Sequence, residues 1–128
     1  MEISYYPDTF NRQDSVGSIK RFFKDLEDDP QLLTMVREIY KKVRKASDLS
    51  FFERQGIVER LPYSQERIYE FRIPPGGRSA GVARLYFGYK RKNSSAIVIL
   101  NAEIKHGRIK ADQDKSKEAE KRYRKVCR

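Results

Sequence analysis

Apolar residues recur every three or four positions in two segments near the N-terminus. The first contains Val16, Ile19, Phe22, Phe23 and Leu26, and the second contains Leu32, Leu33, Val36, Ile39, Tyr40 and Val43. This period places apolar side chains on one face, so each segment predicts an amphipathic helix. Because only a few residues separate the two segments, we expect the helices to form an antiparallel hairpin.

The ends of these helices carry recognisable start signals. Asp14 or Ser15 can cap the first helix, and Asp29 followed by Pro30 suits the cap and first position of the second. Upstream, residues 3–6 are β-type and end at Pro7, which predicts a short edge strand. Residues 47–64 are apolar in places without a clear period, and we expect a packed loop with a helical turn there.

From residue 67 onward the apolar period changes to two. Residues 68–73 alternate until a Pro-Pro-Gly-Gly breaker, a second strand follows over about residues 82–89, and a third follows over residues 96–105. Three successive strands with short connections predict an antiparallel meander. A last helix, over about residues 112–124, is mostly Lys, Glu and Arg, and we expect it to pack loosely or to serve as an arm.

Together these elements predict an α+β fold. An antiparallel sheet, formed by the N-terminal edge strand and the three-strand meander, packs on an α-helical hairpin and is followed by a C-terminal basic helix. With 128 residues and 15.1 kDa, we expect residues 1–128 to form a single domain. The longest apolar run, residues 96–100, is far below the ~18 residues of a membrane span, and residues 1–20 lack a signal-peptide apolar region, so we expect a cytoplasmic protein without a membrane partner. A single cysteine, Cys127, excludes an internal disulfide and a Cys-based metal site, and we interpret it as inert.

The positive charge is concentrated in the second half of the chain. Residues 1–65 contain 11 Lys and Arg against 11 Asp and Glu, whereas residues 66–128 contain 17 against 7, which accounts for the net charge of +10. This asymmetry indicates a surface for a polyanion: nucleic acid, anionic lipid or an acidic protein would each fit, as would a basic face kept for solubility. We interpret the ligand as RNA.

Alternation along the strands sorts their side chains onto two faces. The apolar face takes Tyr69, Phe71, Ile73, Ala83, Leu85, Phe87, Val98, Leu100, Ala102 and Ile104. The opposite face takes Glu70, Arg72, Arg84, Tyr86, Asn101, Glu103 and Lys105. If the Pro-Pro-Gly-Gly loop sets Glu70 opposite Arg84, then Arg72 falls beside Val82, and Arg84 falls near Asn101 or Glu103.

The polar face combines groups that suit RNA chemistry. Arginines bind phosphate through two parallel hydrogen bonds, Tyr86 can stack on a base, and a carboxylate can take a proton. The alternative is cross-strand ion pairing on a solvated sheet, which contributes little stability per pair.

The order of elements, with Tyr69-Glu70-Phe71-Arg72 and Ala83-Arg84-Leu85-Tyr86-Phe87, resembles the RelE/ParE toxin superfamily of type II toxin–antitoxin modules, from about Ile3 to Tyr123. The sequence looks most similar to the HigB-like, phage-derived branch, in which an apolar strand ends in one or two lysines, as at Lys105-His106. The segment over residues 117–122 also resembles the closing helix of that family.

The resemblance implies an mRNA endonuclease, or mRNA interferase, that cuts on the translating ribosome and is encoded beside an antitoxin that occludes it. It implies no metal and no cofactor. The implied catalytic residues are Glu70, Arg72, Arg84, Lys105 and His106. The implied RNA-binding residues are Tyr86, Asn101, Arg108, Lys110 and Tyr123. In such chemistry the 2′-hydroxyl attacks the adjacent phosphate, which requires a base, cations for the phosphate and a donor to the leaving oxygen.

The sequence departs from the pattern of the branch at two positions. Glu103 stands where an aromatic or apolar residue is usual and would neutralise charge beside Arg84, and His106 replaces the second lysine. Two further functions therefore stay open. One is a ParE-like inhibitor that binds a protein target such as DNA gyrase, and the other is an inactive relative that binds RNA or a protein.

Overall fold

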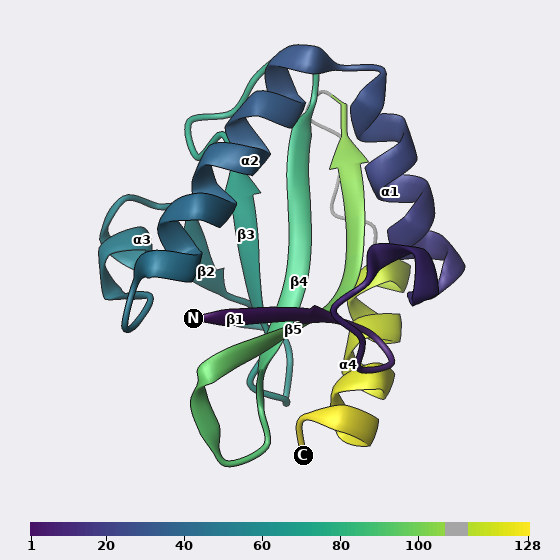
Figure 1. Cartoon of the computed structure of the whole chain (residues 1–128), viewed down its shortest axis with the longest axis vertical. Helices are drawn as coiled ribbons and strands as arrows, with labels where there is room; N and C mark the ends of the chain where they lie inside the picture. The colour runs from purple at the N-terminus through teal and green to yellow at the C-terminus, as the bar shows by residue number, and fades with distance from the viewer. Residues whose placement is uncertain (107–112) are drawn as a thin grey trace.

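The computed structural model describes residues 1–106 and 113–128 as a five-stranded sheet covered by helices on both faces (Figure 1). The elements in chain order are β1 (Glu2–Tyr5), a short 3-10 turn η1 (Arg12–Asp14), α1 (Gly17–Glu27), α2 (Pro30–Lys45), α3 (Ser50–Arg54), β2 (Val58–Arg60), β3 (Tyr69–Ile73), β4 (Val82–Lys90), β5 (Asn93–Lys105) and α4 (Gln113–Val126). The expected α+β class, with a helical hairpin on a sheet and a C-terminal helix, is confirmed.

The sheet has the strand order β1-β5-β4-β3-β2. Strands β3, β4 and β5 form the expected antiparallel meander, and β1 forms one edge. However, β1 runs parallel to β5, so the sheet is mixed; the side-chain pattern of a four-residue strand carries no information about its direction. At the other edge β2 pairs antiparallel with β3. The irregular apolar pattern of residues 47–64 did not predict strand β2, but the helical turn that we expected in this segment is present as α3.

One of the two expected helix caps is present. The Asp29 side chain accepts a hydrogen bond from Leu32 N (3.2 Å) at the start of α2, with Pro30 at the first helical position. The cap expected at Asp14 or Ser15 is wrong: Val16 holds the N-cap position without a side-chain hydrogen bond. Ser15 instead donates its hydroxyl to the carbonyl of Arg12 at 2.6 Å, which closes η1.

The sheet separates two apolar clusters. The larger one lies between the sheet and α1 and α2, and the smaller one joins Tyr86, Val98 and Leu100 to Ala119 of α4 and to Cys127. The expectation that the last helix packs loosely or forms an arm is therefore wrong. The few apolar residues of α4 are enough to hold it on the sheet because they contact an apolar patch of the sheet. Gly88 allows α4 to approach closely, since a Cβ at position 88 would lie 2.7 Å from the Tyr123 ring.

A bulge in β5 decides which side chains reach that patch. Tyr86 pairs with Asn101 but Phe87 pairs with Ile99, so Leu100 is an extra residue in its strand. Val98 and Leu100 consequently face α4, which corrects their expected place beside the helical hairpin. Ala102 packs with the hairpin cluster as expected, and Ile104 packs against it.

The register between β3 and β4 also differs from the expected one. Glu70 lies opposite Tyr86, and Arg72 lies opposite Arg84, a shift of two residues from the expected Glu70–Arg84 pair. A shift of two keeps every side chain on its face, so the polar face survives. The error arises because the long connection over residues 74–81 does not fix the register as a tight turn would.

Candidate functional site

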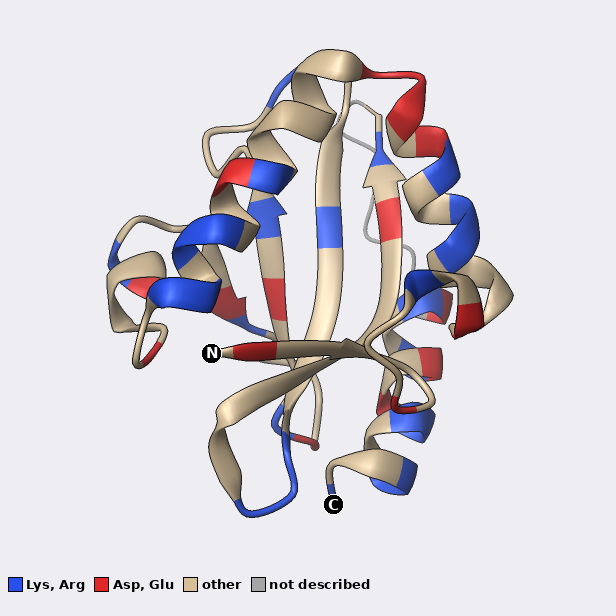
Figure 2. Ribbon diagram, in the orientation of Figure 1, with Lys and Arg blue, Asp and Glu red and all other residues tan. Residues whose placement is uncertain are grey.

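Charged residues of three neighbouring strands meet on the sheet face that also carries α4. We call Glu70 and Arg72 of β3, Arg84 of β4, and Glu103 and Lys105 of β5 the sheet cluster. Direct pairing aligns Arg72 with Arg84 and Arg84 with Glu103, while Lys105 lies opposite Val82. Figure 2 shows the charged segments of these strands side by side. Four of the five implied catalytic residues are thus brought together.

Glu70 is the buried carboxylate of the sheet cluster. The residue is 5% exposed, and Arg72 Nε lies 3.8 Å from its Oε1 atom. The other oxygen, Oε2, is buried without a hydrogen-bond partner among the described residues. Burial raises the pKa of Glu70 above its ordinary value, and Arg84 and then Arg72 partly offset the increase. Glu70 therefore holds a proton more readily than an exposed glutamate, as a general base requires.

The two arginines differ in how far they are already engaged. Arg72 Nη1 donates to Glu59 Oε2 of β2 at 3.0 Å. Arg84 forms no ion pair within the described part of the chain, and its Nε, like that of Arg72, is buried without a hydrogen-bond partner there. An unsatisfied buried donor is costly, and Arg84 also has no carboxylate of the described residues bound to its guanidinium, so it is the arginine whose geometry most favours an incoming anion.

Tyr86 cannot stack on a base. The residue is 0% exposed, and its hydroxyl donates to Glu103 Oε2 at 3.0 Å. Burial, together with the neighbouring Glu103, raises the pKa of Tyr86 well above its ordinary value, so the phenol stays protonated. The expected RNA contact of Tyr86 is corrected to an internal one: the phenol holds the Glu103 carboxylate, and the ring belongs to the smaller apolar cluster.

Asn101 is also engaged inside the fold. Its Oδ1 accepts hydrogen bonds from Ser18 Oγ (2.8 Å) and Ala102 N (3.0 Å), and its Nδ2 donates to the carbonyl of Lys115 (3.1 Å). The side chain thereby ties α1 and α4 to the bulge of β5. Being 1% exposed, it does not offer the RNA contact that we expected from the sequence.

The remaining expected residues lie away from the sheet cluster. His106 is exposed and directly follows β5, and its Nδ1 atom lies 3.1 Å from the carbonyl oxygen of Ala80. A Cβ on Gly81 would contact the side chains of both His106 and Ile104, so these two side chains lie on the same face of the sheet. Ile104 packs against the larger apolar cluster. His106 therefore points to the hairpin side of the sheet. Tyr123 lies over Gly88, beyond Tyr86. Arg108 and Lys110 lie outside the described residues.

Two residues near the sheet cluster were missed by the sequence patterns. Glu59 pairs with Arg72, but no clear strand period surrounds it. Tyr63 is 53% exposed and lines a pocket with Lys117 and Glu120 of α4, near enough to Tyr86 to add slightly to the raised pKa of that phenol. An exposed aromatic within an apolar-poor loop was the signal that could have found Tyr63.

The sheet cluster can bind an anion and exchange a proton. Arg72, Arg84 and Lys105 supply positive charge, and Glu70 supplies a carboxylate with a raised pKa. Glu59 and Glu103 reduce the net charge, so the alternative of cross-strand ion pairing fits Arg72 well and Arg84 less well. Within the described ranges, no group of three or more His, Cys, Asp or Glu could hold a metal ion, and no helix is long and apolar enough to cross a membrane.

Comparisons with known proteins add no relative. No family model, no curated protein and no solved structure matches this chain.

Proposed function

We propose that the protein is the toxin of a type II toxin–antitoxin module and acts as a ribosome-dependent mRNA endonuclease. Its partners are mRNA on the ribosome and a cognate antitoxin from a neighbouring gene. The proposal combines the resemblance to the RelE/ParE superfamily with the chemistry of the sheet cluster. The observation that carries it is Arg84, a partly buried arginine without an ion-pair partner among the described residues, beside the buried Glu70.

In the proposed reaction the RNA 2′-oxygen forms a bond to the adjacent phosphorus, and the bond from phosphorus to the 5′-oxygen breaks. Glu70 takes the proton of the 2′-hydroxyl, since burial has raised the pKa of its carboxyl. Arg84, supported by Arg72, stabilises the negative charge that develops on the phosphate. Lys105 donates a proton to the leaving 5′-oxygen, which thereby becomes a hydroxyl. The products are a 2′,3′-cyclic phosphate and a free 5′-hydroxyl.

The proposal is tested by incubating the purified protein with an mRNA, with and without translating ribosomes, and mapping the new RNA ends. We expect 2′,3′-cyclic phosphate ends that depend on ribosomes. Expression with and without the neighbouring reading frame is expected to show growth arrest only when that frame is missing. Intact RNA under both conditions would refute the nuclease.

A second candidate is an inactive relative that binds RNA or a protein. It is favoured by Glu103, which lies opposite Arg84 and is held there by the hydroxyl of Tyr86. A carboxylate fixed at this position competes with phosphate for the guanidinium. The same experiment separates the two candidates, because the inactive relative would bind RNA or a protein without producing new ends.

A further inference from the structure

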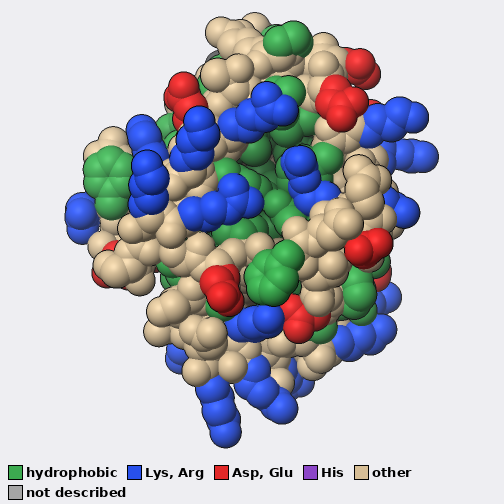
Figure 3. Space-filling view, viewed as in Figure 1, with side chains coloured by type: hydrophobic (Ala, Val, Ile, Leu, Met, Phe, Trp, Pro, Cys, Tyr) green, Lys and Arg blue, Asp and Glu red, His purple; other side chains and the backbone are tan. Residues whose placement is uncertain are grey.

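A groove lies between α1 and α2 on the face of the molecule opposite the sheet cluster. The two helices meet at the Asp28–Pro30 connection and spread apart from it (Figure 1), and the space-filling view shows a hollow between them with an apolar floor (Figure 3). Two adjoining cavities of about 390 Å³ each form this hollow. We call it the helix groove, and its lining residues are Tyr5, Phe10, Arg12, Gln13, Lys20, Arg21, Phe23, Lys24, Leu26, Glu27, Leu33, Val36, Arg37, Tyr40, Lys41 and Arg44.

The floor of the helix groove is built from rings packed edge to face. Phe23 of α1 meets Tyr5 of β1 at a centroid distance of 5.6 Å and Tyr40 of α2 at 6.5 Å. Leu33 and Val36 extend this floor along α2. Side chains from three elements thus hold the floor in one shape, so the hollow exists before any partner arrives.

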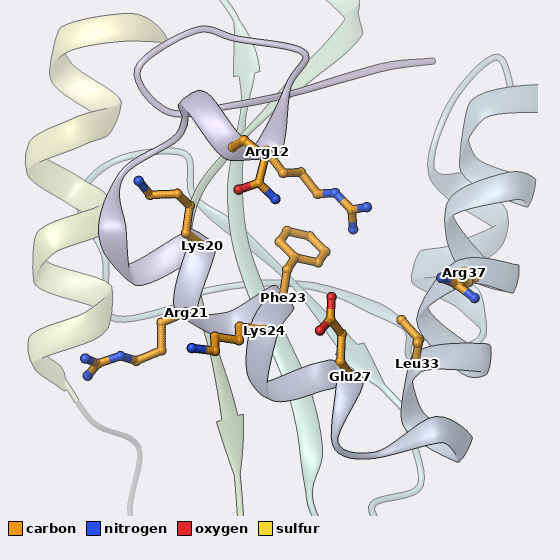
Figure 4. Close-up of a pocket in the computed structure, with 9 residues that line it drawn as sticks. Arg12, Lys20, Arg21, Phe23, Lys24, Glu27, Leu33 and Arg37 are labelled. Atoms are coloured by element: carbon orange, nitrogen blue, oxygen red, sulfur yellow. The ribbon is translucent and has the colours of Figure 1, made fainter.

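The walls of the helix groove are almost entirely cationic. The cations that line it are Arg12, Lys20, Arg21, Lys24, Arg37, Lys41 and Arg44. None of them forms an ion pair with any carboxylate that the structure describes, and Glu27 is the one acidic residue of the lining. The Arg12 guanidinium lies 4.4 Å from the centroid of the Phe23 ring. Figure 4 shows the Arg12 side chain reaching over to the Phe23 ring. Seven cations beside the apolar floor therefore face one carboxylate, and most of their positive charge is left without a counter-charge.

The mouth of the helix groove exposes a large aromatic residue. Phe10 is 66% exposed, the most exposed of the large hydrophobic residues described, and Lys90 Nζ lies 5.5 Å from its ring centroid. Aromatic and arginine side chains are enriched among the residues that contribute most to protein interfaces, and three arginines line the same cavity as Phe10: Arg12, Arg37 and Arg44.

We propose that the helix groove binds an acidic, amphipathic segment of a partner protein. Large apolar side chains of that segment fill the hollow, and its Asp and Glu side chains pair with the cations of the walls. This occupant satisfies both features of the groove at once: the segment removes Phe10 and the half-buried Leu33 from water, and its carboxylates supply the missing counter-charge.

Two other occupants fit less well. Single-stranded RNA binds by stacking successive bases on aromatic faces, but the floor rings Phe23, Tyr5 and Tyr40 are 9%, 2% and 6% exposed. Phe10 is then the one exposed ring among the described lining residues, which is too few for a run of stacked bases. A second copy of the chain would bring a further net charge of +10, which opposes self-association.

The proposal does not depend on RNA cleavage. The floor belongs to the larger apolar cluster, on the opposite side of the sheet from Tyr86 and Arg84, so a segment in the helix groove leaves the sheet cluster uncovered. Binding to the groove is consequently measured on its own, and the failure of one proposal leaves the other standing.

The test is selection of peptides from a displayed library of random 16-residue sequences against the full-length protein. The informative variant is Arg37→Glu/Lys41→Glu, which reverses two exposed cations of the groove wall. The matched control is Lys42→Glu/Lys45→Glu, which reverses two exposed cations of the same helix outside the groove and changes the net charge equally. Thermal melting of both variants checks that each is folded.

We expect enriched peptides that combine large apolar residues with Asp and Glu, and whose synthetic forms bind the control like the wild type. Binding to the groove variant is expected to weaken by about tenfold or more, because carboxylates would then face carboxylates. The proposal is overturned if no peptide distinguishes the two variants, or if the enriched peptides are neutral or basic. It also falls if a 12-nucleotide oligouridine, or self-association of the chain, depends on the groove cations instead.

Discussion

The sheet cluster and the helix groove are both rich in cations, but they differ in how many carboxylates lie near those cations. In the sheet cluster, cations lie among carboxylates. Arg72 lies 3.8 Å from Glu70 of its own strand and 3.0 Å from Glu59 of the neighbouring β2, and Arg84 lies opposite Glu103. In the helix groove seven cations face a single carboxylate, Glu27. The first arrangement holds each charged side chain in a defined position, and the second leaves charge available to a partner.

The difference shows that net charge along a sequence is a poor guide to local surface charge. The first half of the chain has no net charge, yet it forms the surface on which positive charge most outnumbers negative charge. Helix periodicity places Arg37, Lys41 and Arg44 on the wall of the groove, while the acidic residues of that half lie mainly elsewhere. The second half carries the whole excess, yet its sheet cluster is close to balanced. Polyanion binding inferred from the charge of a segment therefore has to be tested region by region.

The largest expected effect is that of Arg84→Ala on RNA cleavage. Losing a donor that stabilises the charge of a transition state typically lowers the rate by about 100- to 1,000-fold. Lys121→Ala, an exposed site on α4, is the control and is expected to cleave like the wild type. Quantified RNA ends and thermal melting on the same preparations provide the measurement. A folded Arg84→Ala protein that cuts at the wild-type rate would show that Arg84 has only a structural role.

The second expected effect is on the salt dependence of RNA affinity, which tells whether RNA binds the sheet cluster or the helix groove. If Arg72, Arg84 and Lys105 each neutralise one phosphate, RNA affinity falls on the order of 20-fold between 50 and 200 mM salt, since each contact contributes a logarithmic slope of about −0.7. Arg72→Ala is expected to reduce the slope by one such increment, and Arg37→Ala to leave it unchanged. A salt-independent affinity would refute the nucleic-acid interpretation, and a slope that responds to Arg37 instead would move the RNA site to the helix groove.

The third prediction concerns the pH dependence that Glu70 confers. Cleavage is expected to decline by about tenfold per pH unit once the pH falls below the raised pKa of Glu70, because the protonated carboxyl no longer accepts the 2′-hydroxyl proton. Glu70→Gln is expected to be slow at every pH. A wild-type rate profile that persists in Glu70→Gln would assign the base to another group.

The same group affects the free energy of unfolding in a direction that its pKa fixes. The folded-state pKa of Glu70 lies above the ordinary value of 4.5, so the folded protein holds this proton more tightly than the unfolded chain does. Stability contributed by the neutral form is present at low pH and is lost as the pH rises from about the ordinary value through the raised one. Denaturant titrations across that window are expected to show a steeper loss in the wild type than in Glu70→Gln.

The smallest expected effect is that of Glu103→Gln. The amide oxygen still accepts the hydrogen bond of Tyr86, but the negative charge opposite Arg84 is gone. We expect RNA affinity to rise about two- to fivefold, in line with the ~0.2–1 kcal/mol of a partly exposed charge pair. Fluorescence titration with a short RNA measures the change, and weaker binding would mean that Glu103 orients Arg84 productively.

The sequence by itself determined the elements whose pattern is local. A period of three to four residues predicted α1 and α2, and a period of two predicted β3, β4 and β5. An element that buries one face needs apolar side chains at the spacing at which its backbone returns to that face. Alternation also assigned Glu70, Arg72 and Arg84 to one face. That assignment survived an error of two residues in register, since only an odd shift changes faces.

The tertiary structure decided what depends on contacts between distant segments. The extra residue Leu100 in β5 turned Val98 and Leu100 toward α4, and this buried Tyr86, which the sequence pattern had left open to RNA. The helix groove likewise depends on the angle at which α1 and α2 diverge, which is set by packing on the sheet. Bulges and interhelical angles are fixed by long-range packing, whereas sequence periodicity reports only the face that each element buries.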